Sequence, residues 1–278
     1  MIVRLGPVLA AVTVLSASAP AVAAPARQPV PEVMAALGDS ISTGFNACGL
    51  FVSCTSRSWS AGDHADVRSH YLRLSKLSAP LQENNHNFAE PGATSADLLD
   101  QVRKAVDAKA DYVTILIGAQ DACVRTEAAM TPVQTYRQRF DAALAELRSG
   151  VPQARVLVAG IPDVRRLWQA GRKNPIARMF WSIGRICQSM LANAKSTKEA
   201  DAERRTRVRE RVMAYNRAAA EACAAYGPNC RTDGGAIFEF PFTLDHISKW
   251  DFFHPNALGQ RVLAEKTYKA GFSWLDPR

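Results

Sequence analysis

A serine follows a Gly-Asp pair at the end of a short apolar run, in "MAALGDSISTG", residues 34–44. The hydroxyl of Ser40 becomes a useful nucleophile only when a base removes its proton, and histidine is the usual base near neutral pH. In "DFFHP" Asp251 precedes His254 by three residues, where its carboxylate could orient the imidazole as an acyl-transfer triad requires. Taken separately, a helix cap explains Ser40 and Asp251 equally well.

Apolar runs alternate with helix-like periodic stretches along the chain. We expect strands at 33–39, 87–90, 111–118 and 154–162, helices at 67–79, 94–108, 131–150 and 257–271, and a long helical region ending near 226. Thr94 and Asp97 are spaced as a capping box. This alternation predicts a three-layer α/β/α fold with a central parallel sheet. Sites in such sheets form at the carboxyl ends of the strands, where "GDS" (38–40) and "GAQD" (118–121) both fall.

The beginning of the chain has the layout of a secretory signal peptide. An early Arg4 is followed by an apolar stretch and then by small residues, with Ala21 and Ala23 suiting cleavage before Ala24. An uncleaved membrane anchor is the alternative, but the apolar run is short for a bilayer span of roughly 20 residues. The 278 residues, 47% hydrophobic, suffice for one sizeable core. We therefore expect a secreted protein with a signal peptide (1–23), a Pro-rich extended lead-in (24–32) and a single domain (33–278).

The number of cysteines is even, and an exported chain permits disulfides. Several pairings are open to six cysteines, and sequence alone does not rank them with certainty. Two close pairs would each close a small loop, which leaves a third pair across a long loop: Cys48 with Cys54, Cys223 with Cys230, and Cys123 with Cys187. The spacing lacks the C-x-x-C and His-x-x-x-His patterns of zinc sites, so we expect no metal.

The formal net charge is +8, of which the signal peptide contributes only Arg4. Such a balance favours either an anionic surface, such as phospholipid headgroups or a cell-wall polymer, or simply a soluble protein with a solvated basic face. The densest run of charge, residues 199–212, mixes Glu with Arg at helical spacing, which is typical of a solvent-facing helix rather than a nucleic-acid arm.

Four separated blocks together resemble the SGNH hydrolases, the GDSL-type secreted esterases and lipases. The blocks are "LGDSIS" (37–42), "EPGATS" (90–95), "IGAQD" (117–121) and "DFFHP" (251–255), with Ile41 where the family name has Leu. The resemblance implies the flavodoxin-like SGNH-hydrolase version of the three-layer fold. It also implies that Ser40 is the nucleophile, His254 the base and Asp251 the orienting acid.

The same resemblance implies an oxyanion hole built from the N–H groups of Ser40 and Gly92 and a side-chain amide at position 120. The family has Asn there and this chain has Gln120, whose amide sits on one more methylene. Loss of one such donor costs roughly 2.7–4 kcal/mol, so Gln120 either finds the right geometry in an adjusted loop or leaves a slow enzyme.

The implied reaction is acyl transfer through an acyl-enzyme, with no metal or organic cofactor and with activity that falls as His254 becomes protonated in acid. We expect a monomer that acts on a small-molecule or lipid ester, without nucleic acid and without stable membrane insertion after signal cleavage. A polysaccharide O-deacetylase uses the same residues. A catalytically impaired protein that binds acylated ligands is the other alternative, and Gln120 is the feature that favours it.

Some residues receive weaker interpretations. Eight apolar residues repeat at helical spacing in 176–191, which indicates a core-facing stripe or else a lid or acyl-binding surface. Trp181 lies off this stripe, so it is expected to face a ligand or solvent. We interpret His64, His70 and His86 as surface histidines. Asp39 is expected to cap the following helix, and Asp121 to stabilise the loop after its strand.

Overall fold

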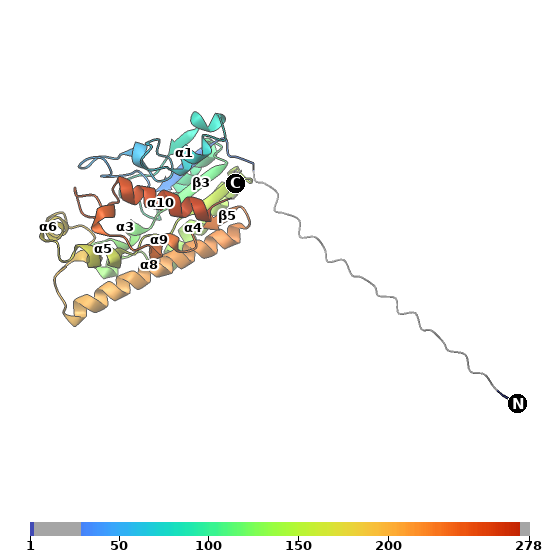
Figure 1. The fold of residues 1–278 in the computed structure, drawn as a ribbon. Coiled ribbons are helices and arrows are strands. Elements are labelled where there is room, and N and C mark those ends of the chain that lie inside the picture. The colour runs from blue at the N-terminus through green and yellow to red at the C-terminus, as the bar shows by residue number, and fades with distance from the viewer. Residues whose placement is uncertain (3–28, 273–278) are drawn as a thin grey trace.

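A five-stranded parallel sheet forms the centre of the computed structural model, which describes residues 1–2 and 29–272. Apart from residues 1–2, the expected signal peptide and its expected cleavage site lie outside the described residues. The strands are β1 (Met34–Gly38), β2 (Asn85–Asn87), β3 (Tyr112–Leu116), β4 (Arg155–Val158) and β5 (Cys230–Thr232), in the order β2-β1-β3-β4-β5 (Figure 1). The order changes direction between β1 and β3, and ligands of doubly wound sheets bind in the crevice at such a point.

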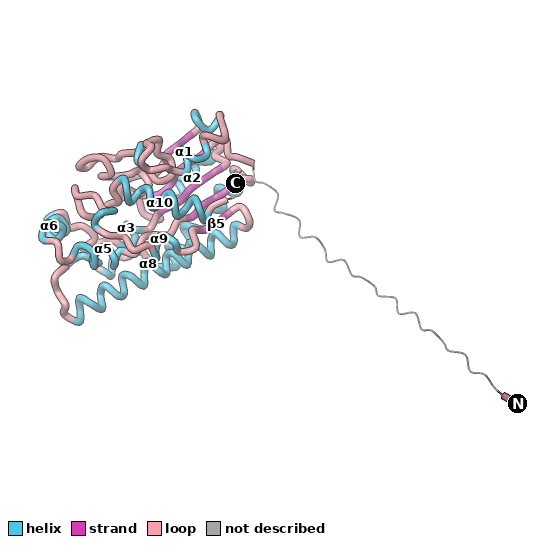
Figure 2. The backbone as a smooth tube through the Cα atoms, in the orientation of Figure 1, coloured by secondary structure: helices cyan, strands magenta, loops and turns pink. Residues whose placement is uncertain are grey.

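Helices cover both faces of this sheet, as the three-layer prediction requires (Figure 2). One layer packs α2 (Leu98–Asp107) against α4 (Val133–Gly150), and α4 against α8 (Glu199–Tyr226). On the other face α1 (His70–Leu74) and α10 (Ala257–Ala270) are joined through a buried histidine. The remaining α-helices are α3 (Ala119–Ala122), α5 (Val164–Gly171), α6 (Pro175–Ile183), α7 (Gln188–Leu191) and α9 (Ala236–Glu239), and the 3-10 turns are η1 (Thr55–Arg57), η2 (Pro80–Gln82), η3 (Glu127–Ala129) and η4 (Leu244–His246).

The three inner strands are buried along their whole length, because helices cover both of their faces. The edge strands β2 and β5 are three residues each and partly exposed. The structure places β2 two residues earlier than expected and adds β5, which the sequence analysis missed because "CRT" is too short and polar to stand out. The chain after β1 forms turns rather than a helix.

The start of α2 differs from the expected capping box. Regular helix begins at Leu98, and the Asp97 carboxylate accepts hydrogen bonds from the Thr94 N–H and hydroxyl. The Thr94 hydroxyl accepts from the Ala96 N–H, whereas the Asp97 N–H, which a capping box would use, donates to the Thr94 carbonyl. The acidic half of the motif is therefore formed and the other half is not.

The expected core-facing stripe of the 176–191 region is wrong for α6 and is confirmed for Cys187, Met190 and Leu191, which are buried. Ile176, Met179 and Ile183 are 52, 50 and 77% exposed, whereas Trp181 is buried. The indole of Trp181 packs on Gly171, where a Cβ would lie 2.3 Å from the ring, and its Nε1 donates to the Phe252 carbonyl at 2.9 Å. These contacts turn the opposite face of α6 inward, and Gly184 to Cys187 then breaks the helix before α7.

Three disulfides are present: Cys48–Cys54, Cys123–Cys187 and Cys223–Cys230. The pairing of the two short loops and one long loop is thus confirmed. The long-range bond ties the segment after α3 to the start of α7, where the Ser189 hydroxyl also donates to the Ala122 carbonyl at 2.6 Å.

His70 is a core residue, contrary to the expectation of a surface histidine. Its ring nitrogens lie 2.7 Å from the Tyr112 hydroxyl and 2.8 Å from the Thr267 hydroxyl. Burial, helped by nearby Arg73, lowers the His70 pKa from 6.5 to about 3. A neutral imidazole can donate from one nitrogen and accept at the other, so it links α1, β3 and α10 without a buried charge. His64 and His86 are partly exposed.

Candidate active site

Ser40 lies on a tight turn directly after β1, at the carboxyl edge of the sheet. Gly38 makes this turn possible, since its φ is +140° and a Cβ would lie 2.1 Å from the Leu116 carbonyl oxygen. The side chain of Gln101 holds the same glycine with two bonds, accepting from its N–H at 2.7 Å and donating to its carbonyl at 3.0 Å.

A second buried amide braces the turn from the opposite face. Gln260 on α10 donates to the Ile41 carbonyl at 2.8 Å and accepts from the Trp59 N–H at 3.0 Å. The Trp59 indole donates to the Ser42 hydroxyl at 3.2 Å. No role could be assigned to Gln101, Gln260 or Trp59 from the sequence. A signal existed, because Gln101 and Gln260 are polar residues on the core-facing stripes of amphipathic helices.

The three residues of the proposed triad form one continuous chain of contacts, although 214 positions separate the serine from the histidine. Ser40 Oγ lies 2.7 Å from His254 Nε2, and His254 Nδ1 lies 2.5 Å from Asp251 Oδ2. All three are buried, with exposed fractions of 3, 9 and 5% for Ser40, His254 and Asp251. Edge contacts from Phe45 and Phe253 flank the imidazole.

Four hydrogen bonds converge on the Asp251 carboxylate. Oδ1 accepts from the N–H groups of Phe253 and His254, at 2.9 and 3.0 Å. Oδ2 accepts from His254 and from Asn46 Nδ2 at 2.5 Å. Burial raises the Asp251 pKa, but the hydrogen bond and charge of His254 and the two N–H groups outweigh it and leave that pKa below its ordinary value. The acid therefore stays ionised beside the imidazole.

Asn46 is the positioning residue to which sequence reasoning gave no role. Its φ is +59°, a left-handed conformation that Asn tolerates better than most residues. Its carbonyl accepts from the Ser248 hydroxyl at 2.8 Å, so the contact to Asp251 is fixed from both ends. One signal in the sequence could have pointed to Asn46. It is a non-glycine residue with an amide side chain in the turn region that follows Ser40.

The three expected oxyanion donors lack internal acceptors. Within the described residues, no hydrogen bond uses the Ser40 N–H, the Gly92 N–H or the Gln120 side-chain amide. Gly92 has φ +85°, and a Cβ there would meet nothing within 4 Å. The positive φ rather than crowding requires glycine. Gln120 is partly exposed in the first turn of α3.

Asp121 joins the loops that carry Gly92 and Gln120. It accepts from the N–H and hydroxyl of Ser95, at 2.8 and 2.6 Å, and Arg139 lies 3.9 Å away. The expectation placed the stabilising contact of Asp121 in the loop after its own strand, whereas the hydrogen bonds of its carboxylate hold the neighbouring loop instead. All four sequence blocks therefore meet at one edge of the sheet.

Comparison with known proteins agrees with this geometry. Residues 34–267 match the family of GDSL-like lipases and acylhydrolases. The chain belongs to that family. Among solved structures, one described as a GDSL-like lipase from Parabacteroides merdae has 17% identity and a TM-score of 0.51, covering 86% of this chain and 94% of its own. Phospholipase A1 from Streptomyces albidoflavus NA297 has 18% identity and a TM-score of 0.50, with coverages of 86 and 98%.

At these identities the two structures show a shared fold, and no curated protein matches the sequence. The GDSL-like family supports an ester hydrolase, while the substrate has to be argued from the site itself. Within the described residues no three His, Cys, Asp or Glu side chains converge as a metal site. The same residues contain no helix that is both long and apolar enough to span a bilayer.

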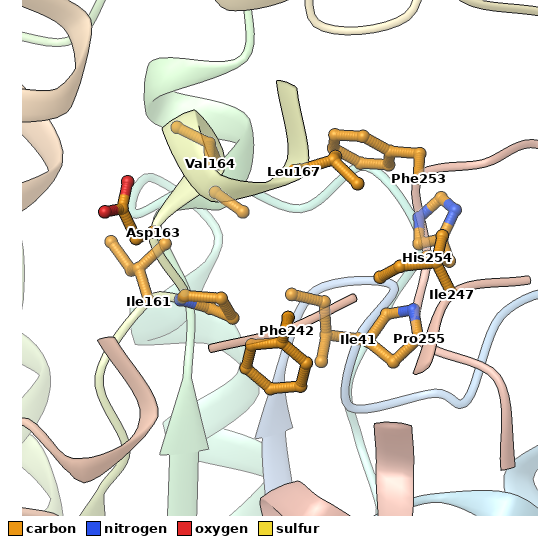
Figure 3. Close-up of a pocket in the computed structure, with 12 residues that line it drawn as sticks. Ile41, Ile161, Asp163, Val164, Leu167, Phe242, Ile247, Phe253, His254 and Pro255 are labelled. Atoms are coloured by element: carbon orange, nitrogen blue, oxygen red, sulfur yellow. The ribbon is translucent and has the colours of Figure 1, made fainter. Parts of the chain in front are cut away.

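A small hollow of about 50 Å³, open to solvent, lies beside the candidate triad of this GDSL-like protein (Figure 3). Its wall begins at Ile41 and His254 and continues along Leu167 and Phe242. The one charged lining residue, Asp163, is bonded to the Arg165 N–H at 2.9 Å and to Arg209 at 2.8 Å. The hollow is therefore apolar and suits an aliphatic or aromatic group attached to a carbonyl near Ser40.

Asp39 lies under the nucleophile turn and is fully buried. Oδ1 accepts from the Ile41 N–H at 2.9 Å, and Oδ2 has no hydrogen-bond partner in the described residues. Burial raises the Asp39 pKa to about 7, although the Ile41 N–H and the charge of His254 lower it. Because no helix follows β1, the expected helix cap is replaced by an Asx-type turn that shapes the nucleophile loop.

Proposed function

We propose that this chain is a secreted carboxylic ester hydrolase that works through Ser40, His254 and Asp251. The observation that carries the proposal is the continuous contact chain from Ser40 Oγ through the His254 ring to Asp251. In this series of contacts the Ser40 hydroxyl donates to Nε2 of His254, and the Nδ1–H of His254 donates to the Asp251 carboxylate. Acyl transfer needs this arrangement.

Ser40 Oγ attacks the ester carbonyl carbon while His254 Nε2 takes the hydroxyl proton, and the negative charge develops on the carbonyl oxygen. The N–H groups of Ser40 and Gly92 and the Gln120 amide donate to that oxygen, since they have no acceptor inside the described chain. Collapse of the intermediate expels the alcohol with the proton from His254. Water then repeats the sequence on the acyl-enzyme.

The apolar hollow supports recognition of the acyl side of the ester. Ile41 follows the nucleophile directly, so an acyl chain bound against it places its carbonyl carbon next to Ser40 Oγ. The apolar wall continues from Ile41 to Leu167 and Phe242, which favours an acyl chain longer than the acetyl group of a polysaccharide.

Secretion is proposed from two features that agree. The N-terminal layout is that of a signal peptide, and the folded domain holds all six cysteines in disulfides. Disulfides persist in oxidising compartments and are rare in the cytosol.

Hydrolysis of p-nitrophenyl esters by the oxidised mature chain tests the activity. We expect turnover of the butyrate, none by Ser40→Ala, and higher kcat/KM for the butyrate or octanoate than for the acetate. Silence of the wild-type chain toward every ester length, with folded protein by circular dichroism, would refute the proposal. A preference for acetyl xylan or acetylated peptidoglycan would instead identify a polysaccharide deacetylase.

Leu167→Trp tests the hollow without touching the triad. Leu167 projects from α5 into the space beside Phe253, so a larger ring fills the acyl site (Figure 3). We expect kcat/KM for the octanoate to fall about tenfold to a hundredfold while the acetate changes little. Equal losses for both esters would show that the hollow does not bind the acyl chain.

An impaired acyl-binding protein is the second candidate, and Gln120 is the observation that favours it. Gln120→Asn places the amide one methylene closer to the backbone. If the wild-type chain is slow and Gln120→Asn raises kcat by about 10²–10³, the oxyanion hole is the defect. If the substitution lowers kcat by a similar factor, the loop is adjusted to Gln and the chain is a competent enzyme.

A further inference from the structure

The positive charge of this protein is concentrated in one segment. Residues 164–198, called here the cationic segment, contain eight of the 34 Lys and Arg residues and none of the 26 Asp and Glu residues. That excess equals the formal net charge of the whole chain, +8. The eight are Arg165, Arg166, Arg172, Lys173, Arg178, Arg185, Lys195 and Lys198.

These cations are not neutralised by the fold. No ion pair within the described residues involves any of the eight. The nearby acids have other partners, since Asp163 binds Arg209 and Asp201 binds Arg204. A hollow of about 400 Å³ is lined by four of the cations and one proline, with Lys173 and Lys195 both exposed.

An apolar helix face lies within this cationic field. Ile176, Met179 and Ile183 occupy one side of α6 and are at least half exposed, as described above. Arg178 lies on the same helix, where its side chain donates to the Arg172 carbonyl at 3.0 Å. Exposed apolar clusters of this kind on a soluble protein mark interaction surfaces.

This helix is attached directly to the candidate active site. The Phe180 ring packs on the Phe252 ring at 5.6 Å, and Trp181 donates to the carbonyl of Phe252, two residues before His254. On the other side of the imidazole, Phe45 begins the loop that the Cys48–Cys54 disulfide closes. Figure 1 shows α6 and this loop at the same end of the molecule, where the strands end.

The tip of that loop repeats the apolar character. Leu50, Phe51 and Val52 are 46, 76 and 46% exposed, and residues 48–54 carry no charge. Two separate elements at this end of the molecule therefore carry protruding hydrocarbon, with the cations beside one of them.

We propose that α6 and the Leu50–Val52 loop dock this protein onto the surface of an anionic phospholipid bilayer, with the candidate active site facing the lipid. The cations meet headgroup phosphates, and the exposed aliphatic side chains enter the boundary between headgroups and acyl chains. An acidic wall polymer matches the charge, but it offers no hydrocarbon for Ile176, Met179 and Ile183. The docking requires no catalytic step, so it stands or falls separately from the proposed ester hydrolysis.

Vesicle co-sedimentation of the oxidised Ser40→Ala protein measures docking without hydrolysis. We expect binding to phosphatidylcholine vesicles that contain phosphatidylglycerol, and at least about tenfold weaker binding to phosphatidylcholine alone. Two variants dissect the surface. Ile176→Ser/Met179→Ser/Ile183→Ser removes the hydrocarbon, and Lys173→Gln/Lys195→Gln removes two exposed cations.

Each variant should weaken binding to the anionic vesicles about tenfold or more. The matched control is Lys109→Gln/Lys269→Gln, the same charge change at two exposed lysines outside the cationic segment, one shortly before β3 begins and one in the last turn of α10. It should bind like the parent. Thermal unfolding midpoints confirm that every variant is folded.

Three results would overturn the proposal. One is the absence of binding to anionic vesicles. Another is an equal loss in the Lys109→Gln/Lys269→Gln control, which would mean that total charge rather than this surface matters. The third is unchanged binding by the triple serine variant, which would identify a purely ionic contact of the kind that an acidic polymer makes.

Discussion

Asp251 shows how one carboxylate is divided between two tasks. Its Oδ1 accepts from two backbone N–H groups and fixes the turn before His254, while its Oδ2 faces the imidazole. Asn46 donates to that second oxygen and therefore holds it in the plane where His254 needs it. A charge-assisted hydrogen bond of this kind contributes more than a neutral one.

Asn46→Gly removes this bond while tolerating the φ of +59°. We expect kcat for a soluble ester to fall about tenfold to a hundredfold with little change in KM, because the group lost orients the triad and does not bind substrate. Asn84→Gly is the control, since it loses a hydrogen bond from the Asn84 side-chain amide to the Pro80 carbonyl, outside the candidate triad. Unchanged kcat in Asn46→Gly would remove the positioning role.

At the scale of the elements, α6 and α7 depend on contacts outside themselves. α7 has four residues and α6 nine, too few for stability as isolated helices. Trp181 anchors α6 to the His254 loop, and the Cys123–Cys187 disulfide anchors the start of α7 beside α3. The region that flanks the site is thus fixed by contacts to neighbouring elements rather than by a large core of its own.

The disulfides should differ in their effect on stability because they close loops of different length. Cys123–Cys187 spans 64 positions and Cys48–Cys54 spans six. In the chain-entropy model, Cys123→Ala/Cys187→Ala lowers the free energy of unfolding by roughly 4 kcal/mol and Cys48→Ala/Cys54→Ala by roughly 2 kcal/mol. Urea unfolding of the two variants beside the parent measures both values. A larger loss for the short loop would contradict this prediction.

At the scale of the whole molecule, two fully buried titrating groups act in opposite directions on stability. The Asp39 pKa rises from 3.8 to about 7 on folding, so the folded state binds more protons and Asp39 reduces stability as pH increases across that interval. The His70 pKa falls from 6.5 to about 3, so the folded state binds fewer protons and His70 increases stability as pH increases. The effects of Asp39 and His70 on the pH dependence of the free energy of unfolding therefore largely cancel in mildly acidic solution.

Variants of these residues should separate the contributions. Asp39→Asn keeps the acceptor for the Ile41 N–H but does not titrate, so its free energy of unfolding should increase with pH relative to the parent, by a few kcal/mol in total, between about pH 4 and 7. His70→Gln should show the opposite trend over about pH 3 to 6.5. Urea unfolding across this range checks both, and profiles parallel to the parent would refute the assigned pKa shifts.

Much of the frame could be predicted from the sequence, because buried parallel strands and amphipathic helices leave strong periodic signals. β1, β3 and β4 are apolar runs, and α4 and α10 end within one residue of where the pattern stops. The short edge strand β5 has no such signal. The roles of Gln101 and Gln260 were missed, because the hydrogen bonds of a buried side-chain amide depend on which backbone groups the fold brings next to it.

The sequence by itself determined which side chains could do chemistry, since a serine nucleophile, an imidazole base, an orienting carboxylate and amide donors are requirements of residue type. Only the tertiary structure decided which side of α6 faces inward. Both sides are apolar, so periodicity could not choose between Trp181 and the face of Ile176, Met179 and Ile183. The cavity over Gly171 and the Phe252 carbonyl accept the indole and its N–H, and the aliphatic side chains are left in solvent.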